Sequence, residues 1–369
     1  MTDKNKKPEW APRDAGAEFT SFVMPGVALR DEDKINVKNA KLNRHAFDTP
    51  ALVKGVLEGN VTLLSKAITL IESSSARHVE QAQNLLKELM PHTGKSIRIG
   101  ITGPPGTGKS TFIDALGTFL CRNGFKVAVL AIDPSSARTR GSILGDKTRM
   151  ESLLRETNAF IRPSPAGATL GGVAKKTRET ILLCEAAGYD VIIIETVGVG
   201  QSEVTVRSMV DFFLLLLLPG GGDELQGIKK GIVELADGMA VNKADGDNVQ
   251  RANLTRSQYS NALSLLAPAT EGWKTKVVTC SALEKTGLDV LWSTVNEFVE
   301  NTKNSGVFDR RRREQIIDWV YSMVEEDLKN RFYGNPRVAE NRESIERQIM
   351  HNDITPAQAV QRFMELAEE

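Results

Sequence analysis

The chain has 369 residues, a mass of 40.4 kDa, and 47 basic Lys and Arg side chains that balance 47 acidic Asp and Glu side chains. A neutral total argues against a nucleic-acid-binding protein, because phosphate contacts usually require an excess of basic side chains. The 41% hydrophobic and 25% charged residues are typical of a soluble globular protein with a substantial core.

The scarce cysteines and histidines argue against disulfides and against a zinc or nickel site, because no CxxC pair or Cys/His cluster occurs. We expect a cytoplasmic protein with reduced, buried thiols. The first 20 residues mix acidic and basic side chains, unlike a secretory or transit signal. The longest apolar run, 212–218, is too short to span a bilayer, so no membrane partner is expected. The three cysteines are Cys121, Cys184 and Cys280, and the four histidines are His45, His78, His92 and His351.

The first 93 residues divide into a polar extension and a helical section. Residues 1–45 contain three prolines and no sustained hydrophobic periodicity, which predicts a flexible extension. Over residues 46–93 apolar side chains recur at helical spacing, and Pro91 ends the pattern.

Residues 94–303 alternate apolar, strand-like runs with helical stretches. This alternation predicts an α/β fold in which parallel strands are joined by crossover helices. The run at 212–218 is apolar throughout, which indicates a strand buried on both faces. The predicted strands are 97–102, 127–132, 191–195, 212–218, 238–242 and 276–280, and the predicted helices are 110–122, 173–187, 223–235, 248–266 and 288–301.

The segment 304–369 is helical without strands. After a basic run at 310–313, apolar residues repeat along one face through residue 328, and a second helical stretch follows Gly334 and Pro336. The pattern predicts two antiparallel helices. They either fold back on the core or pair with another subunit, and the sequence leaves both open.

A glycine-rich run follows the first predicted strand and opens the next helix. Residues 103–110, GPPGTGKS, match G-x-x-x-x-G-K-[ST] in the strand–loop–helix context that this motif requires. Glycines let backbone N–H groups converge on phosphates, while Lys109 is expected to neutralise them and Ser110 to bind Mg²⁺. The context disfavours a glycine turn that binds nothing. The predicted phosphate-binding residues are Gly103, Pro104, Pro105, Gly106, Thr107, Gly108, Lys109, Ser110 and Thr111.

Two later loops, each after a predicted strand, favour guanine as the base. Asn242, Lys243 and Asp245 match the pattern N-K-x-D, and the Asp245 carboxylate can accept hydrogen bonds from guanine N1–H and N2–H₂. Adenine lacks matching donors, so ATP would leave this carboxylate poorly paired. The loop Ser281, Ala282 and Leu283 is expected to read guanine O6 through its backbone. The two loops together predict GTP rather than ATP.

Three carboxylates are candidates for the metal and γ-phosphate side. Asp133 and Glu195 stand at strand ends, where parallel strands bring residues to one crevice, and Asp146 lies on a polar loop. Helix capping or simple solvation is the alternative role of these acids. Gly198 is positioned to offer its amide to the γ-phosphate. No glutamine directly follows it, and Gln201 is displaced, which suggests slow hydrolysis until a partner binds.

Four stretches together resemble one family, the methylmalonyl-CoA mutase-associated GTPases, also called the MeaB/ArgK family. They are 133–136, 141–150, 195–203 and 220–231, and the resemblance spans about residues 50–330. Arg140 stands where this family usually has a second glycine. The resemblance implies a P-loop GTPase domain with a mainly parallel sheet over residues 94–303. It also implies flanking helical N- and C-terminal extensions, with 304–369 forming a homodimer.

This resemblance also implies the biological role and further residue roles. The role is a GTP-hydrolysing chaperone of an adenosylcobalamin-dependent acyl-CoA mutase, which gates cofactor loading and protects or reactivates the enzyme. An adenosyltransferase is a second implied partner, and GTP, GDP and Mg²⁺ are the implied ligands. The implied catalytic residues are Lys109, Asp146, Glu195 and Gly198, the metal ligands are Ser110, Asp133, Asp146 and Glu195, and the signalling switch contains Gly220, Asp223, Gln226 and Lys229.

Three other classes of protein share parts of these patterns. A nickel-type metallochaperone GTPase would need a His-rich tract or a CxxC relay, and a membrane-targeting GTPase would need a Met-rich amphipathic segment; the sequence has neither. A P-loop kinase conflicts with the guanine-type motif at 242–245. The partner mutase stays open among the methylmalonyl-, ethylmalonyl-, isobutyryl- and hydroxyisobutyryl-CoA types.

Overall fold

The computed structural model describes residues 47–73, 75–132, 150–163, 170–196, 202–220 and 230–368. The chain divides into two compact units, Met1–Asp48 and Thr49–Glu369. The fold described here is that of the second unit, and the predicted extension at 1–45 lies outside the described residues. No described helix has the length and apolar character needed to cross a membrane.

A seven-stranded sheet forms the centre of this unit, and its strands follow the order β3-β2-β4-β1-β5-β6-β7. Every pairing between neighbours is parallel. The α/β prediction is therefore confirmed. The strands are β1 Ile97–Thr102, β2 Val127–Ile132, β3 Ala159–Pro163, β4 Val191–Thr196, β5 Phe212–Leu217, β6 Gly238–Val241 and β7 Lys276–Thr279.

Strand β5 shows how the sheet is buried on both faces, as its apolar run predicts. Phe212, Leu214 and Leu216 belong to one core cluster, while Leu215 and Leu217 belong to a second cluster on the other face. This division follows from the two-residue period of side chains along a strand. Covering helices are required on both faces, as expected for an all-parallel sheet.

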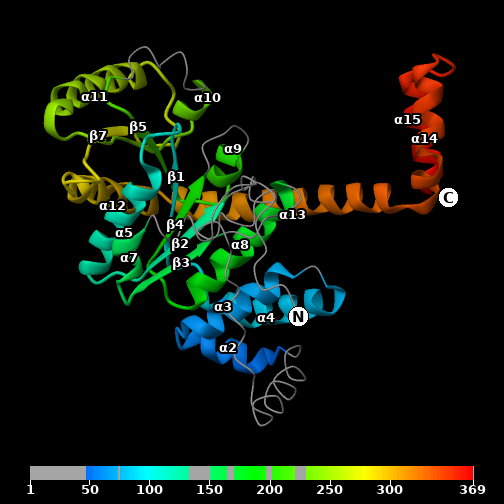
Figure 1. Cartoon of the computed structure of the whole chain (residues 1–369), viewed down its shortest axis with the longest axis horizontal. Coiled ribbons are helices and arrows are strands. Elements are labelled where there is room, and N and C mark those ends of the chain that lie inside the picture. Colours follow the sequence, from blue (N-terminus) through cyan, green and yellow to red (C-terminus); the bar gives the residue numbers. More distant parts are fainter. Residues whose placement is uncertain are drawn as a thin grey trace, which may run out of the picture. The chain divides into compact units, whose positions relative to one another are not determined.

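The helices between the strands supply these covers. Figure 1 shows α5 and α12 on one side of the central strands, and α8 and α9 on the other. The helix α11 packs beside the outer strands, where Ala252 and Tyr259 join the second core cluster. The bounds are α5 Lys109–Arg122, α7 Glu151–Leu154, α8 Leu170–Ala186, α9 Ser202–Arg207, α10 Lys230–Val233, α11 Val249–Leu263 and α12 Leu288–Asn304.

The helical section before the sheet consists of α2 Thr49–Leu57, α3 Val61–Glu72, α4 Ala76–Leu89 and a short 3₁₀ turn, Met90–His92. Asn60 begins α3, because its side chain accepts hydrogen bonds from the amides of Thr62 and Leu63. The section is tied to the sheet unit by polar contacts, including Gln83 Nε2 to Glu179 Oε1 on α8 at 3.3 Å.

The C-terminal segment contains three helices, so the prediction of two is wrong. They are α13 Val307–Gly334, α14 Pro336–Met350 and α15 Pro356–Glu368. The predicted second helix breaks because Asn352 takes a left-handed φ of 58° and Pro356 cannot continue a helix that precedes it. Thr355 then accepts a hydrogen bond from the Gln358 amide and begins α15. In Figure 1, α14 and α15 lie side by side beyond the end of α13.

The basic run at 310–313 anchors the first turns of α13 to the amino ends of two strands. Arg312 pairs with Asp211, the residue before β5, through contacts of 2.6 and 2.7 Å, and it also donates to the carbonyls of Gly94 and Ser96. Arg311 contacts Asp237, the residue before β6. Farther along, α13 exposes the apolar residues Ile316, Ile317, Val320, Tyr321, Val324 and Leu328.

Candidate functional site

The glycine-rich loop joins the end of β1 to the start of α5. Gly103 has φ 155° and lies so close to β5 that an added Cβ would be 2.6 Å from the Leu216 carbonyl oxygen. Gly108 has φ 81°, a left-handed conformation that other residues adopt at a cost. The loop shape therefore depends on glycine at these two positions.

Lys109 lies over this loop. Its ammonium donates to the carbonyl oxygens of Gly103 at 2.8 Å and Pro104 at 3.3 Å. Burial lowers the pKa of Lys109, and the negative charges of Glu195 and Glu203 act in the opposite direction. The loop thus holds a partly desolvated cation next to backbone that can receive an anion.

Ser110 and Glu195 meet at the carboxyl ends of β1 and β4. The parallel register places Ile101 opposite Glu195, and the Ser110 hydroxyl donates to Glu195 Oε1 at 3.2 Å. One residue farther along, Thr196 donates to Thr102 at 2.9 Å inside the sheet. Hydroxyl and carboxylate oxygens side by side are the donor set that Mg²⁺ prefers, so the residues present fit that ion. The described residues contain no cluster of three or more His, Cys, Asp or Glu side chains arranged to hold a metal.

Asn242 joins the glycine-rich loop to both predicted base-reading loops. Its side-chain amide donates to the Thr107 carbonyl at 2.8 Å, and its Oδ1 accepts from the Ala282 amide at 3.1 Å. The residue is 1% exposed, so these bonds form away from solvent. A single side chain therefore fixes the spacing of three loops that are far apart in sequence.

Asp245 and Ser281 bring the two base-reading loops into direct contact. The Ser281 hydroxyl donates to Asp245 Oδ2, and the Ala244 amide donates to the Cys280 carbonyl at 3.0 Å. Lys243 is exposed with φ 60°, and its Cε is 3.8 Å from where a Cβ on Gly108 would lie. Its aliphatic stem thus runs beside the phosphate loop. This arrangement offers a carboxylate acceptor and an apolar stem to a planar base.

The described structure brings most of the predicted site residues to one edge of the sheet. Gly220, three residues after β5, donates its amide to the Thr255 hydroxyl of α11 at 3.0 Å. Leu283 is exposed at the end of its loop. The predicted site residues Asp133, Asp146, Gly198, Asp223, Gln226 and Lys229 lie outside the described residues.

Sequence reasoning assigned no role to two features of this edge. One is the Thr102–Thr196 pair, which has no motif and becomes visible only once β1 and β4 are aligned. The other is Glu203 on α9, a buried acid that the sequence places only as the last residue of the stretch 195–203. Its burial depends on the packing of α9, which no local pattern predicts.

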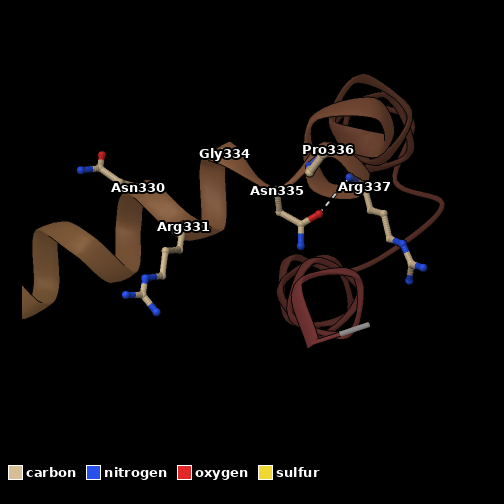
Figure 2. Close-up of a pocket in the computed structure, with 6 residues that line it drawn as sticks. All are labelled: Asn330, Arg331, Gly334, Asn335, Pro336 and Arg337. Carbon is tan, nitrogen blue, oxygen red and sulfur yellow. Dashed lines mark hydrogen bonds between the residues drawn. The ribbon is translucent and has the colours of Figure 1, made fainter. Parts of the chain in front are cut away.

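The structure also contains a cavity of about 610 Å³ that is separate from this site. Figure 2 shows it at the junction of α13 and α14, where Asn335 accepts a hydrogen bond from the Arg337 amide at 2.9 Å and begins α14. None of the predicted nucleotide-binding residues lines it. The six lining residues are Asn330, Arg331, Gly334, Asn335, Pro336 and Arg337.

Comparisons with known proteins agree with the geometry. Residues 64–337 match the family model described as methylmalonyl Co-A mutase-associated GTPase MeaB. A probable GTPase of Mycobacterium tuberculosis is 51% identical over 324 residues, which cover 88% of this chain and 96% of the relative. The GTPase ArgK of Escherichia coli is 48% identical, with 77% of this chain and 86% of ArgK covered.

Two further similarities extend the comparison to animals and to solved structures. The mitochondrial methylmalonic aciduria type A homolog of Mus musculus is 44% identical over 84% of this chain and 77% of its own length. A crystal structure titled LAO/AO transport system kinase is 37% identical, with a TM-score of 0.70 over 87% of this chain and 98% of that one.

Proposed function

The chain belongs to the methylmalonyl-CoA mutase-associated GTPase (MeaB) family, and on this premise we propose that it is a chaperone of an adenosylcobalamin-dependent acyl-CoA mutase. Its relatives are named GTPases and its fold is that of a P-loop GTPase, so the chain is a GTPase. The proposed role is to couple GTP hydrolysis to loading of the cobalamin cofactor and to protection or reactivation of the mutase. An adenosyltransferase is a proposed second partner.

The observation that carries the nucleotide assignment is the position of Asn242 between the phosphate loop and the base-reading loops. We assign the phosphates to residues 103–111, with Lys109 neutralising the β- and γ-phosphates. We assign the guanine edge to Asp245 and guanine O6 to the backbone of 281–283. Because one side chain sets the distance between these parts, they would bind the two ends of a single GTP molecule.

A magnesium ion fits the phosphate side of this assignment. Ser110 and Glu195, whose side chains are hydrogen bonded to each other, would hold it together with Asp133 and Asp146. When bound, such an ion would neutralise negative charge on the nucleotide phosphates. Gly198 would offer its amide to the γ-phosphate, and Asp223, Gln226 and Lys229 would relay the nucleotide state from the switch that begins at Gly220.

We propose the division into segments that the sequence suggests. Residues 1–45 are an extension, 46–93 a helical section, 94–303 the GTPase domain and 304–369 a dimerisation segment. The exposed apolar face of α13 supports the last assignment, because Ile317, Tyr321, Val324 and Leu328 recur at spacings of four, three and four residues. This spacing is the one that pairs two helices along a common seam.

The decisive experiment measures GTP turnover with and without purified adenosylcobalamin-dependent acyl-CoA mutases. We expect one mutase to bind the chain and to accelerate turnover severalfold. The Lys109→Ala variant should show no stimulated turnover, which identifies the measured phosphate release as this protein's own. If no such mutase binds or changes turnover, the chaperone assignment fails while the GTPase assignment stands.

A further inference from the structure

Two buried threonines join β1 and β4 just beyond the point where the backbones of these strands stop pairing. The backbone pairing ends at Ile101 and Glu195. The next residues, Thr102 and Thr196, are 1% and 0% exposed, and a hydrogen bond of 2.9 Å joins their hydroxyl oxygens. A hydroxyl can both donate and accept, so this threonine pair continues the connection between the two strands.

The backbone of each threonine is also paired on its other side. Thr102 pairs with Leu215 of β5, and Thr196 pairs with Ile132 of β2. The hydroxyl bond therefore connects two halves of the sheet at its carboxyl edge. This is the edge that carries the phosphate loop, which starts directly after Thr102.

The threonine pair and the contact of Ser110 with Glu195 lie on opposite faces of the sheet. Side chains alternate along a strand, so Glu195 and Thr196 point in opposite directions. Glu195 meets Ser110 of α5. The threonine pair lies on the face that α9 covers, where an added Cβ at Gly100 would be 2.8 Å from Val206. The pair can thus hold the strand ends without taking up an oxygen of Ser110 or Glu195.

The spacing of the Ser110 and Glu195 oxygens suits two ligands of one magnesium ion. They are 3.2 Å apart, which is long for a hydrogen bond between a hydroxyl and a carboxylate. Adjacent ligands of octahedral Mg²⁺, each at about 2.0–2.1 Å, lie about 2.9 Å apart, and the ion tolerates little departure from this geometry. Binding of the ion would end the bond between Ser110 and Glu195, whereas the threonine bond would stay.

We propose that Thr102 and Thr196 are positioning residues that hold Ser110 and Glu195 at the spacing that Mg²⁺ requires. Thr196 fixes the backbone that carries Glu195, and Thr102 fixes the start of the loop that leads to Ser110. The inference rests on the GTPase site and on the magnesium assignment proposed above. It does not depend on the mutase partner.

The first test removes one hydroxyl and keeps the shape of the side chain. In Thr196→Val, the Mg²⁺ concentration for half-maximal binding of a non-hydrolysable GTP analogue should rise about five- to tenfold, the effect of one lost hydrogen bond. GDP affinity in EDTA should stay within twofold of the parent, because no ion is then bound. Thr196→Ser retains a hydroxyl and should resemble the parent.

A matched control removes a buried hydroxyl elsewhere. Thr302 of α12 is 2% exposed, and its hydroxyl donates to the Phe298 carbonyl at 2.7 Å. Thr302→Val should leave the Mg²⁺ requirement unchanged, whatever its effect on Tm.

A double variant separates positioning from stability. Thr196→Val leaves the Thr102 hydroxyl buried without its partner and should lower Tm. Thr102→Val combined with Thr196→Val replaces both partners by apolar groups of the same shape, so most of the Tm should return. The Mg²⁺ requirement should stay raised, because the bond between the strand ends is still missing.

The measurements are titration with MgCl₂ at a fixed concentration of fluorescent GTP analogue, GDP titration in EDTA and thermal unfolding, all without any mutase. An Mg²⁺ requirement of Thr196→Val within twofold of the parent would overturn the inference. So would a double variant that regains the parent requirement together with its Tm, or a loss of GDP affinity in EDTA, since either would mark the pair as structural. If the parent itself binds the analogue equally with and without Mg²⁺, the magnesium assignment fails as well. The chaperone assignment stands in every case.

Discussion

Asn242 is predicted from a short motif, and the structure shows which loops its side chain holds together. The motif places it next to the base-reading Asp245, and the structure shows it bonded to the phosphate loop and to the 281–283 loop. A buried amide with a donor and an acceptor is suited to this task, because it can satisfy one carbonyl and one N–H at once.

We predict that Asn242→Ala weakens GTP binding about 30-fold or more. The change leaves the Thr107 carbonyl and the Ala282 amide buried without partners, at about 1–3 kcal/mol each. Titration with a fluorescent GTP analogue measures the loss. The exposed Asn253 of α11 provides the control, and Asn253→Ala should leave binding unchanged. Equal affinities for the two variants would contradict the bridging role.

At the scale of elements, the first turns of α13 depend on buried ion pairs. The side chains of Arg312 and Asp211 are 12% and 1% exposed, whereas Arg310 and its partner Glu271 are both largely exposed. Four consecutive arginines in the sequence resemble a basic surface patch. In the structure, Arg311 instead forms an ion pair with Asp237, the residue before β6, and Arg312 forms one with Asp211, the residue before β5.

We predict that Arg312→Ala lowers the free energy of unfolding by about 3 kcal/mol or more, because it leaves the buried Asp211 carboxylate without its ion-pair partner and with the Arg98 amide as its remaining donor. The matched variant Arg310→Ala removes an exposed pair and should cost about 1 kcal/mol or less. Urea unfolding monitored by tryptophan fluorescence compares the two. If both variants lose the same stability, the anchor is not a buried ion pair.

The elements that could be predicted from the sequence are those whose pattern is local. Apolar residues predict six of the strands, in a continuous run in β5 and in alternation with Arg98, Gly100 and Thr102 in β1. The predicted positions of these six strands agree with the structure within one residue at each end. The sequence pattern does not predict β3, Ala159–Pro163. It is a half-exposed edge strand of five residues that contains Arg162 and Pro163, so it shows neither a continuous run nor strict alternation.

The site residues divide in the same way. Some are predicted by a local sequence pattern, and others depend on contacts between distant parts of the chain. The glycine-rich loop and the 242–245 motif can be predicted from the sequence alone, because each follows an apolar strand. The contact of Ser110 with Glu195 and the burial of Glu203 depend on strand order and helix packing, which no local pattern records. Apolar spacing does not show the break before α15, because it continues through Val360 and Phe363 despite Pro356.

For the whole molecule, the exposed apolar face of α13 predicts self-association. Charged residues at two positions of this seam, Val324→Asp with Leu328→Asp, should convert a dimer into a monomer because a carboxylate cannot be buried unpaired in a helix seam. Sedimentation velocity measures the mass, and nucleotide titration should show unchanged GDP binding. A control substitution at the isolated exposed Val290, Val290→Asp, should leave the dimer intact. A dimeric double variant would contradict the seam.

The strand order of the sheet has a consequence for how the chain matures on the ribosome. β1 carries the phosphate loop, yet its hydrogen-bonding neighbours are β4 and β5, and Ile99 pairs with Phe212. At ~5–20 residues per second of translation, the loop leaves the ribosome on the order of ten seconds before its flanking strands exist. Nucleotide therefore cannot assist the early steps of folding, because the strands that flank β1 have not yet been made. Binding of GTP to the new chain indicates that the centre of the sheet has formed.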